Sequence, residues 1–349
     1  MKYQPSLDGL RAIAITAVVF YHAYPNLFVG GWMGVDIFFV LSGYLITTIL
    51  KREIDETEGL SFKNFYMRRL LRLGPAAASL YVFEIFRAVF NSPHRTEILQ
   101  ATLVSALYFM NWNQAFDLFP QDILGHTWSL SMEEQFYLLW PAALLFINRR
   151  RPAIWLSIAI TSILFWRCGL VAFGSGGNRL YNGFDTHSDG LLTGCLVAFC
   201  ANSDWLRGAA KAASLPAILA MCFALFLLPY DAKVTLTIGL TVVAIASAIV
   251  MVSSFEDQRM REFLRKPALV FTGKISYGWY LWHFPAIFLA GSHVNKHSPG
   301  GALIFAAAIP ASYLAAVGSY FLIERPFLRL KRNYPAAAAS EASALAPAA

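Results

Sequence analysis

The feature that most constrains this chain is a series of apolar stretches, each about 20 residues long and almost free of charge. About 20 predominantly apolar residues are what a helix needs to cross a bilayer. Helices satisfy their backbone hydrogen bonds internally, which an open strand does not do in lipid. We therefore predict an all-α polytopic membrane protein with about ten transmembrane helices. The predicted spans lie near residues 9–28, 32–50, 74–91, 128–147, 153–172, 187–202, 213–229, 234–254, 276–293 and 301–323.

Composition supports this class. Hydrophobic residues make up 57% of the 349 residues and charged residues 14%, whereas soluble domains are about 45–50% apolar and about 25% charged. This excludes a soluble enzyme with a single anchor and leaves little material for a second globular domain. We predict one transmembrane domain over residues 1–330, followed by a disordered, alanine-rich tail at residues 331–349.

The placement of the basic residues predicts the orientation. With ten spans and a cytoplasmic N-terminus, 21 of the 28 lysines and arginines fall on the cytoplasmic side and four on the outer side. Such an excess is typical of cytoplasmic loops. Both termini are therefore expected in the cytoplasm. The net charge of +7 is explained by topology and lipid contact, without nucleic acid as a partner.

One apolar segment, residues 98–116, carries no charge until residue 117 and resembles an eleventh span. Counting it as a span would move the arginines at 149–151 to the outer side. The segment also contains Asn111, Asn113 and Gln114. We therefore predict an outer-face or partly embedded helix.

Ionisable residues within a span are costly, so they are candidates for function. Arg11 and His22 are eleven residues apart, which places them about 20° apart on one helix face and about 16 Å apart along its axis. Asp8 lies near the same face. An imidazole at that depth can accept and pass on a proton. The alternative is a histidine hydrogen-bonded to a neighbouring helix, with Arg11 extending to the membrane surface.

Further charges gather beside other spans. Arg68, Arg69 and Arg72 precede Gly74-Pro75 at helical spacing and would form one cationic face suited to phosphate. The alternative is ordinary basic flanking of a span. Glu133, with an adjacent glutamate, enters the span at 128–147, where it would pair with an arginine, orient a histidine or form a purely structural ion pair.

Four weaker candidates would face a substrate on the acceptor side. They are Asp36, His187, Asp189 and His283. For His187 and Asp189 the alternative is a pair of solvated loop-end residues, and for His283 it is a structural histidine. We predict no metal site, because no His- or Cys-based ligand motif occurs in the sequence.

Several of these segments together resemble the acyltransferase family 3 of integral-membrane O-acyltransferases. The resemblance covers about residues 3–330, and the motifs occur in the order typical of the family. They are residues 6–14 with His22, residues 34–46, the arginines before Gly74, and residues 128–137, 275–285 and 324–326.

The resemblance implies transfer of an acyl group, commonly acetyl, from cytoplasmic acyl-CoA to a hydroxyl of a surface or exported glycan or a related glycoside. It implies no permanently bound cofactor, acetyl-CoA as donor substrate, a glycan or glycolipid acceptor, and the bacterial inner membrane as location. The arginine–histidine pair of the family's first helix maps onto Arg11 and His22, and its basic motif maps onto Arg68, Arg69 and Arg72. Here the motif reads RRLLR instead of a tight R-x-R triplet.

On this reading His22 is the general base for the acceptor hydroxyl. Arg11 would stabilise the oxyanion or hold the CoA arm, and Glu133 or Asp8 would orient the imidazole. The other route is an acyl-enzyme intermediate on His22. A transporter that uses the same buried charges as a relay is the main rival, followed by an inactive scaffold. The acceptor, the acyl chain length and the oligomeric state are left open by the sequence.

Overall fold

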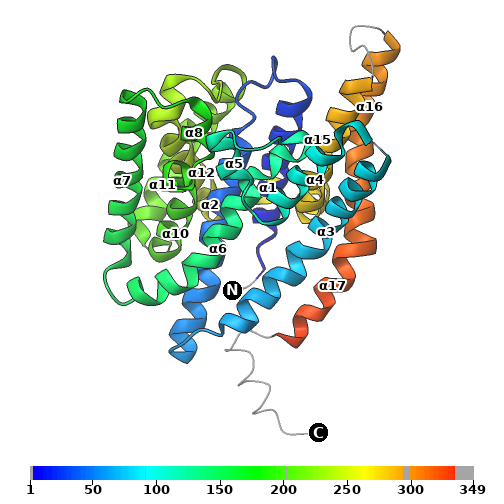
Figure 1. The fold of residues 1–349 in the computed structure, drawn as a ribbon. Coiled ribbons are helices and arrows are strands. Elements are labelled where there is room, and N and C mark those ends of the chain that lie inside the picture. Colours follow the sequence, from blue (N-terminus) through cyan, green and yellow to red (C-terminus); the bar gives the residue numbers. More distant parts are fainter. Residues whose placement is uncertain (1–2, 91, 202, 294–298, 335–349) are drawn as a thin grey trace, which may run out of the picture.

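The computed structural model describes residues 3–90, 92–201, 203–293 and 299–334. In this part of the chain every regular element is a helix and no strand occurs (Figure 1). The prediction of an all-α protein is therefore confirmed. The predicted tail from residue 335 onward lies outside the described residues. The first residues of the predicted tail, where disorder was expected, form a 3₁₀ turn, η5 (Lys331–Asn333).

Six of the described helices are long and apolar enough to cross a membrane. Each overlaps a predicted span, and three of them continue as helices past an internal proline, at Pro75, Pro216 and Pro310. Two of them continue through a π-turn: η3 (Thr235–Gly239) into α12 (Leu240–Glu256), and α16 (Pro299–Ser319) through η4 (Tyr320–Glu324) into α17 (Arg325–Leu330). The others are α2 (Met33–Thr57), α3 (Phe62–Phe90), α7 (Pro152–Ala172) and α11 (Asp204–Leu227).

The four remaining predicted spans coincide with helices that are either too short or not apolar enough to be counted among these six. They are α1 (Pro5–Ala23), α6 (Trp128–Ile147), α10 (Asp189–Cys200) and α15 (Ser276–His293). The 12 residues of α10 rise only about 18 Å, less than the roughly 30 Å hydrocarbon core. Two short helices, α8 (Gly177–Asn182) and α9 (Phe184–His187), precede it along the chain.

The ambiguous segment at residues 98–116 is two helices, α4 (Arg95–Ala106) and α5 (Met110–Phe116). Tyr108 between them has a φ of 53°, which breaks the helix. Neither piece is long enough to cross a bilayer alone. Asn111 accepts a hydrogen bond from Gln135 at 2.9 Å, so its polar side chain is satisfied by α6 within the protein.

Helix α2 lies at the centre of the bundle and packs against α1, α6, α10 and α12. Its contact with α10 depends on Gly43 and Gly194, since a Cβ atom on either would overlap the backbone of the other helix. Figure 1 places the start of α1, the α2–α3 and α6–α7 connections and α17 together at the lower end of the bundle. The connecting helices α13 (Gln258–Leu264) and α14 (Pro267–Lys274) pack against α1.

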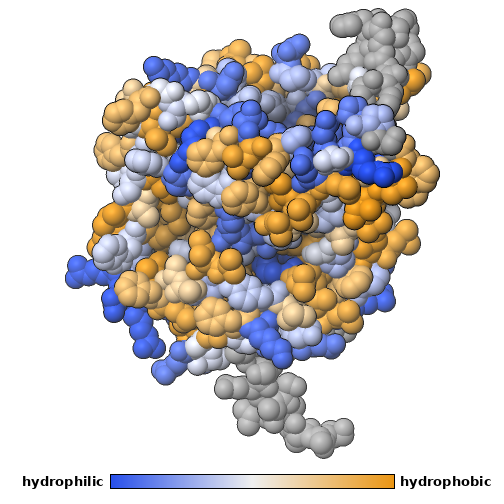
Figure 2. Space-filling model, viewed as in Figure 1, coloured by the Kyte–Doolittle hydropathy of each residue, from blue (hydrophilic) through white to orange (hydrophobic). Residues whose placement is uncertain are grey.

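The outer surface of the bundle is apolar. In both α7 and α11 only 11% of the most hydrophobic window is buried inside the protein, and side chains such as Phe165 and Phe223 are exposed. Figure 2 shows apolar side chains over much of one face, with hydrophilic side chains visible between them near its centre. Exposed apolar helices of this length indicate a multi-pass membrane protein.

Candidate active site

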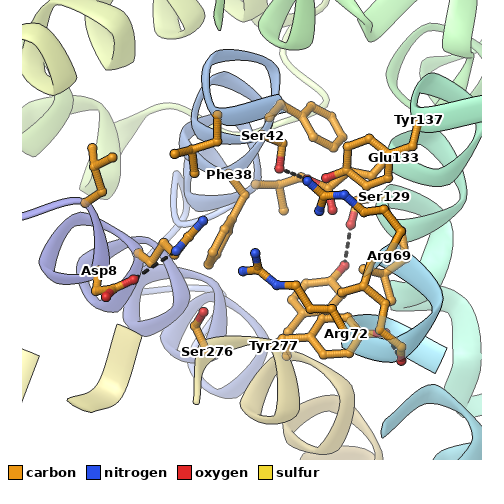
Figure 3. A pocket seen from close by; sticks show the side chains of 18 of the residues that line it. Asp8, Phe38, Ser42, Arg69, Arg72, Ser129, Glu133, Tyr137, Ser276 and Tyr277 are labelled. Carbon is orange, nitrogen blue, oxygen red and sulfur yellow. Dashed lines mark hydrogen bonds and ion pairs between the residues drawn. The ribbon is translucent and has the colours of Figure 1, made fainter. Parts of the chain in front are cut away.

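A cavity of about 320 Å³, which we call the inner cavity, lies near the end of the bundle where α1 begins. Side chains of α1, α2, α3, α6 and α15 line it (Figure 3). Its charged lining residues are Asp8, Arg11, Arg69, Arg72 and Glu133. The helices thus bring together residues that the sequence predicted for both catalysis and donor binding.

Arg69 and Arg72 are three residues apart on α3 and face the inner cavity together. Arg72 points toward its centre in Figure 3, while the Arg69 guanidinium carbon lies 4.5 Å from the centre of the Tyr137 ring. Neither guanidinium forms an ion pair or hydrogen bond with a residue that the structure describes. Two guanidinium groups with no ion-pair or hydrogen-bond partner among the described residues are suited to a bound anion, which they can bind by paired hydrogen bonds.

Arg68 is separated from these two residues. Its guanidinium lies 3.4 Å from a carboxylate oxygen of Glu53 on α2, and it donates to the Tyr334 carbonyl at 3.2 Å. Arg68 does not line the inner cavity. Of the three arginines that the sequence assigns to acyl-CoA, the structure therefore directs two toward the cavity and one toward an acidic partner.

Arg11 and Asp8 form an ion pair with an N–O distance of 2.9 Å at the side of the inner cavity. The Tyr3 hydroxyl donates to the same carboxylate at 2.6 Å. Burial, followed by the hydrogen bond to Asp8, raises the pKa of Tyr3 to about 12, so Tyr3 remains a donor at neutral pH. Asp8 thus holds Arg11 in place from the cavity wall.

Glu133 lies across the inner cavity from Asp8 and accepts a hydrogen bond from the Ser42 hydroxyl of α2 (Figure 3). Arg69 and Arg72 lie close enough to act on its carboxyl group electrostatically. Glu133 and Asp8 line a different cavity from His22. The sequence predicted that Glu133 or Asp8 would orient the His22 imidazole. No hydrogen bond between the described residues connects either carboxylate with that imidazole.

A second cavity of about 270 Å³, the outer cavity, holds His22. Its wall combines amide side chains with aromatic rings. This mixture offers hydrogen-bond donors, acceptors and flat apolar faces together. The polar lining residues besides His22 are Gln114, Gln121, Asp122, His126, Asn178 and Asn182, and the aromatic ones are Tyr21, Trp32, Trp128, Tyr181, Tyr230, Tyr280 and Phe284.

His22 is half-buried and has two polar partners, the backbone of Val18 one turn earlier on α1 and a second histidine. Nε2 of His283 lies 3.0 Å from Nδ1 of His22. The edge of the His22 ring meets the Phe284 ring at a centroid distance of 4.9 Å. His283 was expected on the acceptor side, and the structure places its ring directly behind His22.

The two cavities adjoin. Val35 of α2 and Tyr280 of α15 line both of them. The Tyr280 hydroxyl is held between Ser129, at 2.7 Å, and the backbone carbonyl of His126. The two cavities therefore share part of one wall, formed by Val35 and the fixed side chain of Tyr280.

None of the four acceptor-side candidates lines either cavity. Asp36 and His187 are fully buried and form an ion pair with an N–O distance of 3.0 Å between α2 and α9. Asp189 is fully buried as well and pairs with Arg167 of α7 at 3.1 Å. These contacts join α2, α7, α9 and α10, an arrangement typical of structural pairs rather than of a substrate surface.

Thr241 of α12 connects the second of these pairs, because its hydroxyl donates to Asp189 at 2.5 Å and accepts from Arg167 at 2.6 Å. The isosteric change Thr241→Val leaves both buried charges with one hydrogen bond fewer. We expect it to lower the free energy of unfolding by about 1–3 kcal/mol, measured by thermal unfolding of the purified protein. Thr237→Val, at a more exposed position of the preceding turn, should change stability by less than about 0.5 kcal/mol. Equal stability of both variants would contradict the buried network.

Among the described residues, no group of three or more His, Cys, Asp or Glu side chains is arranged to hold a metal ion.

The sequence missed several residues that shape the site. Ser42, Tyr137 and Tyr280 were visible only as polar or aromatic members of apolar spans. Their partners lie on other helices, so no local spacing could assign them.

Comparison with known proteins bears on this arrangement. A sequence model described as an acyltransferase domain matches residues 4–321. A peptidoglycan O-acetyltransferase, OatA, of Listeria monocytogenes is 35% identical over 350 residues, which cover 93% of this chain and 56% of that protein. The O-acetyltransferase OatA of Staphylococcus aureus is 33% identical and is covered to 57%. The chain thus spans little more than half the length of these relatives. No solved structure matches.

Proposed function

Because the chain belongs to the acyltransferase family, whose domain matches residues 4–321, we propose that it is a membrane O-acetyltransferase. It moves an acetyl group from cytoplasmic acetyl-CoA to a hydroxyl of a surface or exported glycan. The observation that carries this proposal is the pair of adjoining cavities, one with unpaired arginines and one with His22. The O-acetyltransferase names of its relatives support the same reaction.

The proposed location is the cytoplasmic membrane of a bacterium, with about ten spans and both termini in the cytoplasm. The lower end of the bundle in Figure 1 carries the α6–α7 connection, with Arg149, Arg150 and Arg151, and the ends of α2 and α3 that meet there, with Lys51, Arg52 and Lys63. The inner cavity lies toward this end and the outer cavity away from it. A donor from the cytoplasm and an acceptor from outside would therefore reach opposite cavities.

The phosphates of acetyl-CoA bind to Arg69 and Arg72 in this proposal. Arginine forms strong, paired hydrogen bonds to phosphate, and neither of these two guanidinium groups would have to break a hydrogen bond or ion pair with a described residue to do so. Arg11, fixed by Asp8, lies on the path of the pantetheine arm. His22 is eleven residues further along α1, about 16 Å away, which the extended arm spans.

Lys331 gives this donor site a pH dependence. Burial, followed by the charges of Arg72, Arg69 and Arg68, lowers the pKa of Lys331 to about 8. Lys331 is therefore charged below about pH 8 and loses its charge above it, and a nearby anion favours the charged form. We expect the KM for acetyl-CoA to rise about two- to fivefold from pH 7 to pH 9.

The measurement is initial rates at both pH values for the protein and for Lys331→Met, which should lose the dependence. Lys63→Met, at an exposed site on the same helix as the arginines, should keep it. A KM that rises equally in Lys331→Met would assign the dependence to another group.

In the transfer step His22 removes the proton of the acceptor hydroxyl. The hydroxyl oxygen forms a bond to the acetyl carbon as the carbon–sulfur bond breaks. The proton passes from His22 to the CoA thiolate, which leaves as the thiol. An acetyl group carried first by His22 would give the same products in two steps.

The outer cavity fits a sugar acceptor. Its amide side chains match the donors and acceptors of several hydroxyl groups, and its aromatic rings match the apolar face of a pyranose. The name of the Listeria relative makes peptidoglycan the first acceptor to test.

Deletion of the gene, followed by measurement of base-labile acetate on purified peptidoglycan and exported glycans, tests the proposal. One fraction should lose acetate and regain it upon complementation. Unchanged acetate on every fraction would contradict the proposal.

A further inference from the structure

A histidine that the transfer step does not use lies behind His22, beside the outer cavity. His283 is fully buried, and its Nδ1 atom lies 2.7 Å from the carbonyl oxygen of Tyr280 and 3.2 Å from that of Trp279. Its Nε2 atom faces Nδ1 of His22. The remaining described contacts of His283 are with the rings of His126, Tyr280 and Phe284.

These contacts determine which ring nitrogen carries the proton. A carbonyl oxygen only accepts, so Nδ1 of His283 must carry the hydrogen and donate it. In the neutral ring Nε2 then holds a lone pair and accepts from Nδ1–H of His22. His22 is left with its own lone pair on Nε2, the nitrogen that a general base needs.

The opposite state would disable the base. If His283 carried two protons, its Nε2 would donate to His22, and Nδ1 of His22 would become the acceptor. The proton of His22 would then lie on Nε2, and no lone pair would remain for a hydroxyl. No carboxylate among the described residues contacts His283 to stabilise such a charge.

We propose that His283 is the positioning residue for His22: it selects the tautomer of His22 with a free Nε2 and holds the ring toward the outer cavity. This inference rests on the proposed function, in which His22 is the base. When His22 takes the hydroxyl proton on Nε2, its Nδ1–H continues to donate to His283. His283 therefore stabilises the imidazolium without itself changing its protonation.

The neighbouring contacts show why the ring is held so firmly. One turn before His283, helix α15 is fixed at two adjacent residues. The Tyr280 hydroxyl lies between Ser129 and the His126 carbonyl, and the Trp279 indole donates to Ser312 at 3.0 Å. A side chain on a helix fixed at two points has little freedom to rotate away from His22. Such an anchored partner is what a precise catalytic geometry requires.

The test compares His283→Leu with His283→Gln in the purified full chain. Leucine removes the acceptor, whereas the glutamine side-chain oxygen can lie near the position of Nε2 and accept from His22. We expect His283→Leu to lower kcat about 10- to 100-fold, the usual effect of losing a partner that orients an imidazole. The KM for acetyl-CoA should stay within about twofold, because the donor binds in the inner cavity. The kcat of His283→Gln should be about tenfold higher than that of His283→Leu.

Two further variants separate the possible failures. Thr241→Val loosens a buried network away from both cavities and should lower thermal stability while kcat is unchanged. If His283→Leu keeps the wild-type kcat while His22→Ala is inactive, the inference is overturned and the proposed function is left intact. Equal loss in the leucine and glutamine variants, matched by an equal loss of stability, would overturn it as well. Full activity of His22→Ala would overturn the proposed function itself.

Discussion

Replacing His22 with alanine should abolish acetyl transfer and leave the protein folded. A positioned general base contributes about 10²–10⁴-fold to a rate, so kcat should fall by at least that factor. The side chain lines a cavity and is only half-buried, so its loss removes little packing. The KM for acetyl-CoA should not change, since the arginines that bind the donor lie in the other cavity. Release of CoA thiol in the presence of a glycan acceptor measures the rate.

A matched control is His94→Ala, because His94 is an exposed histidine that pairs with Glu97 away from both cavities. It should keep full activity. Both variants should elute as the same species and unfold at similar temperatures. Wild-type turnover in His22→Ala would remove the imidazole from the mechanism.

The second large effect should come from the arginines of α3. Each charge-assisted hydrogen bond contributes about 1.5–3 kcal/mol, so the double change Arg69→Ala and Arg72→Ala should raise the KM for acetyl-CoA about 10²-fold or more. kcat at saturating donor should change far less. Initial rates over a range of acetyl-CoA concentrations, with acceptor in excess, measure both constants.

The structure also predicts that Arg68 contributes less to donor binding than Arg69 and Arg72 do. Arg68→Ala should raise this KM by less than about threefold, because Arg68 pairs with Glu53 outside the cavity. Arg52→Ala, an exposed arginine on α2, controls for the general loss of positive charge. A lower kcat with unchanged KM in the double variant would give Arg69 and Arg72 a role other than binding the donor.

The sequence predicted the helical class of the protein but not how the candidate residues are grouped in space. The long apolar stretches determine the helices, and helical spacing correctly places Arg11 and His22 on one helix. The same spacing does not show that a wall formed by Val35 and Tyr280 separates them into two cavities. That wall belongs to α2 and α15, which are distant in the chain.

The arginine cluster illustrates the same limit. Arg68 and Arg72 are four residues apart and share a helix face, so periodicity alone cannot separate them. The carboxylate of Glu53, from the preceding helix, draws Arg68 away. Likewise, Asp36 and His187 are 151 residues apart, and their pairing arises only from the packing of α2 against the helices near α10. Partners of this kind are tertiary and leave no local pattern.

The donor should enter the cavity with the arginines, and the acceptor should receive the acetyl group at the opposite face. Proteoliposomes with acetyl-CoA enclosed and a glycan acceptor outside test it directly. For molecules whose inner cavity faces the lumen, acetylated glycan should accumulate outside in step with CoA thiol inside, and His22→Ala should give neither. Product formed only when donor and acceptor share a compartment, or acceptor transported without CoA release, would contradict the account.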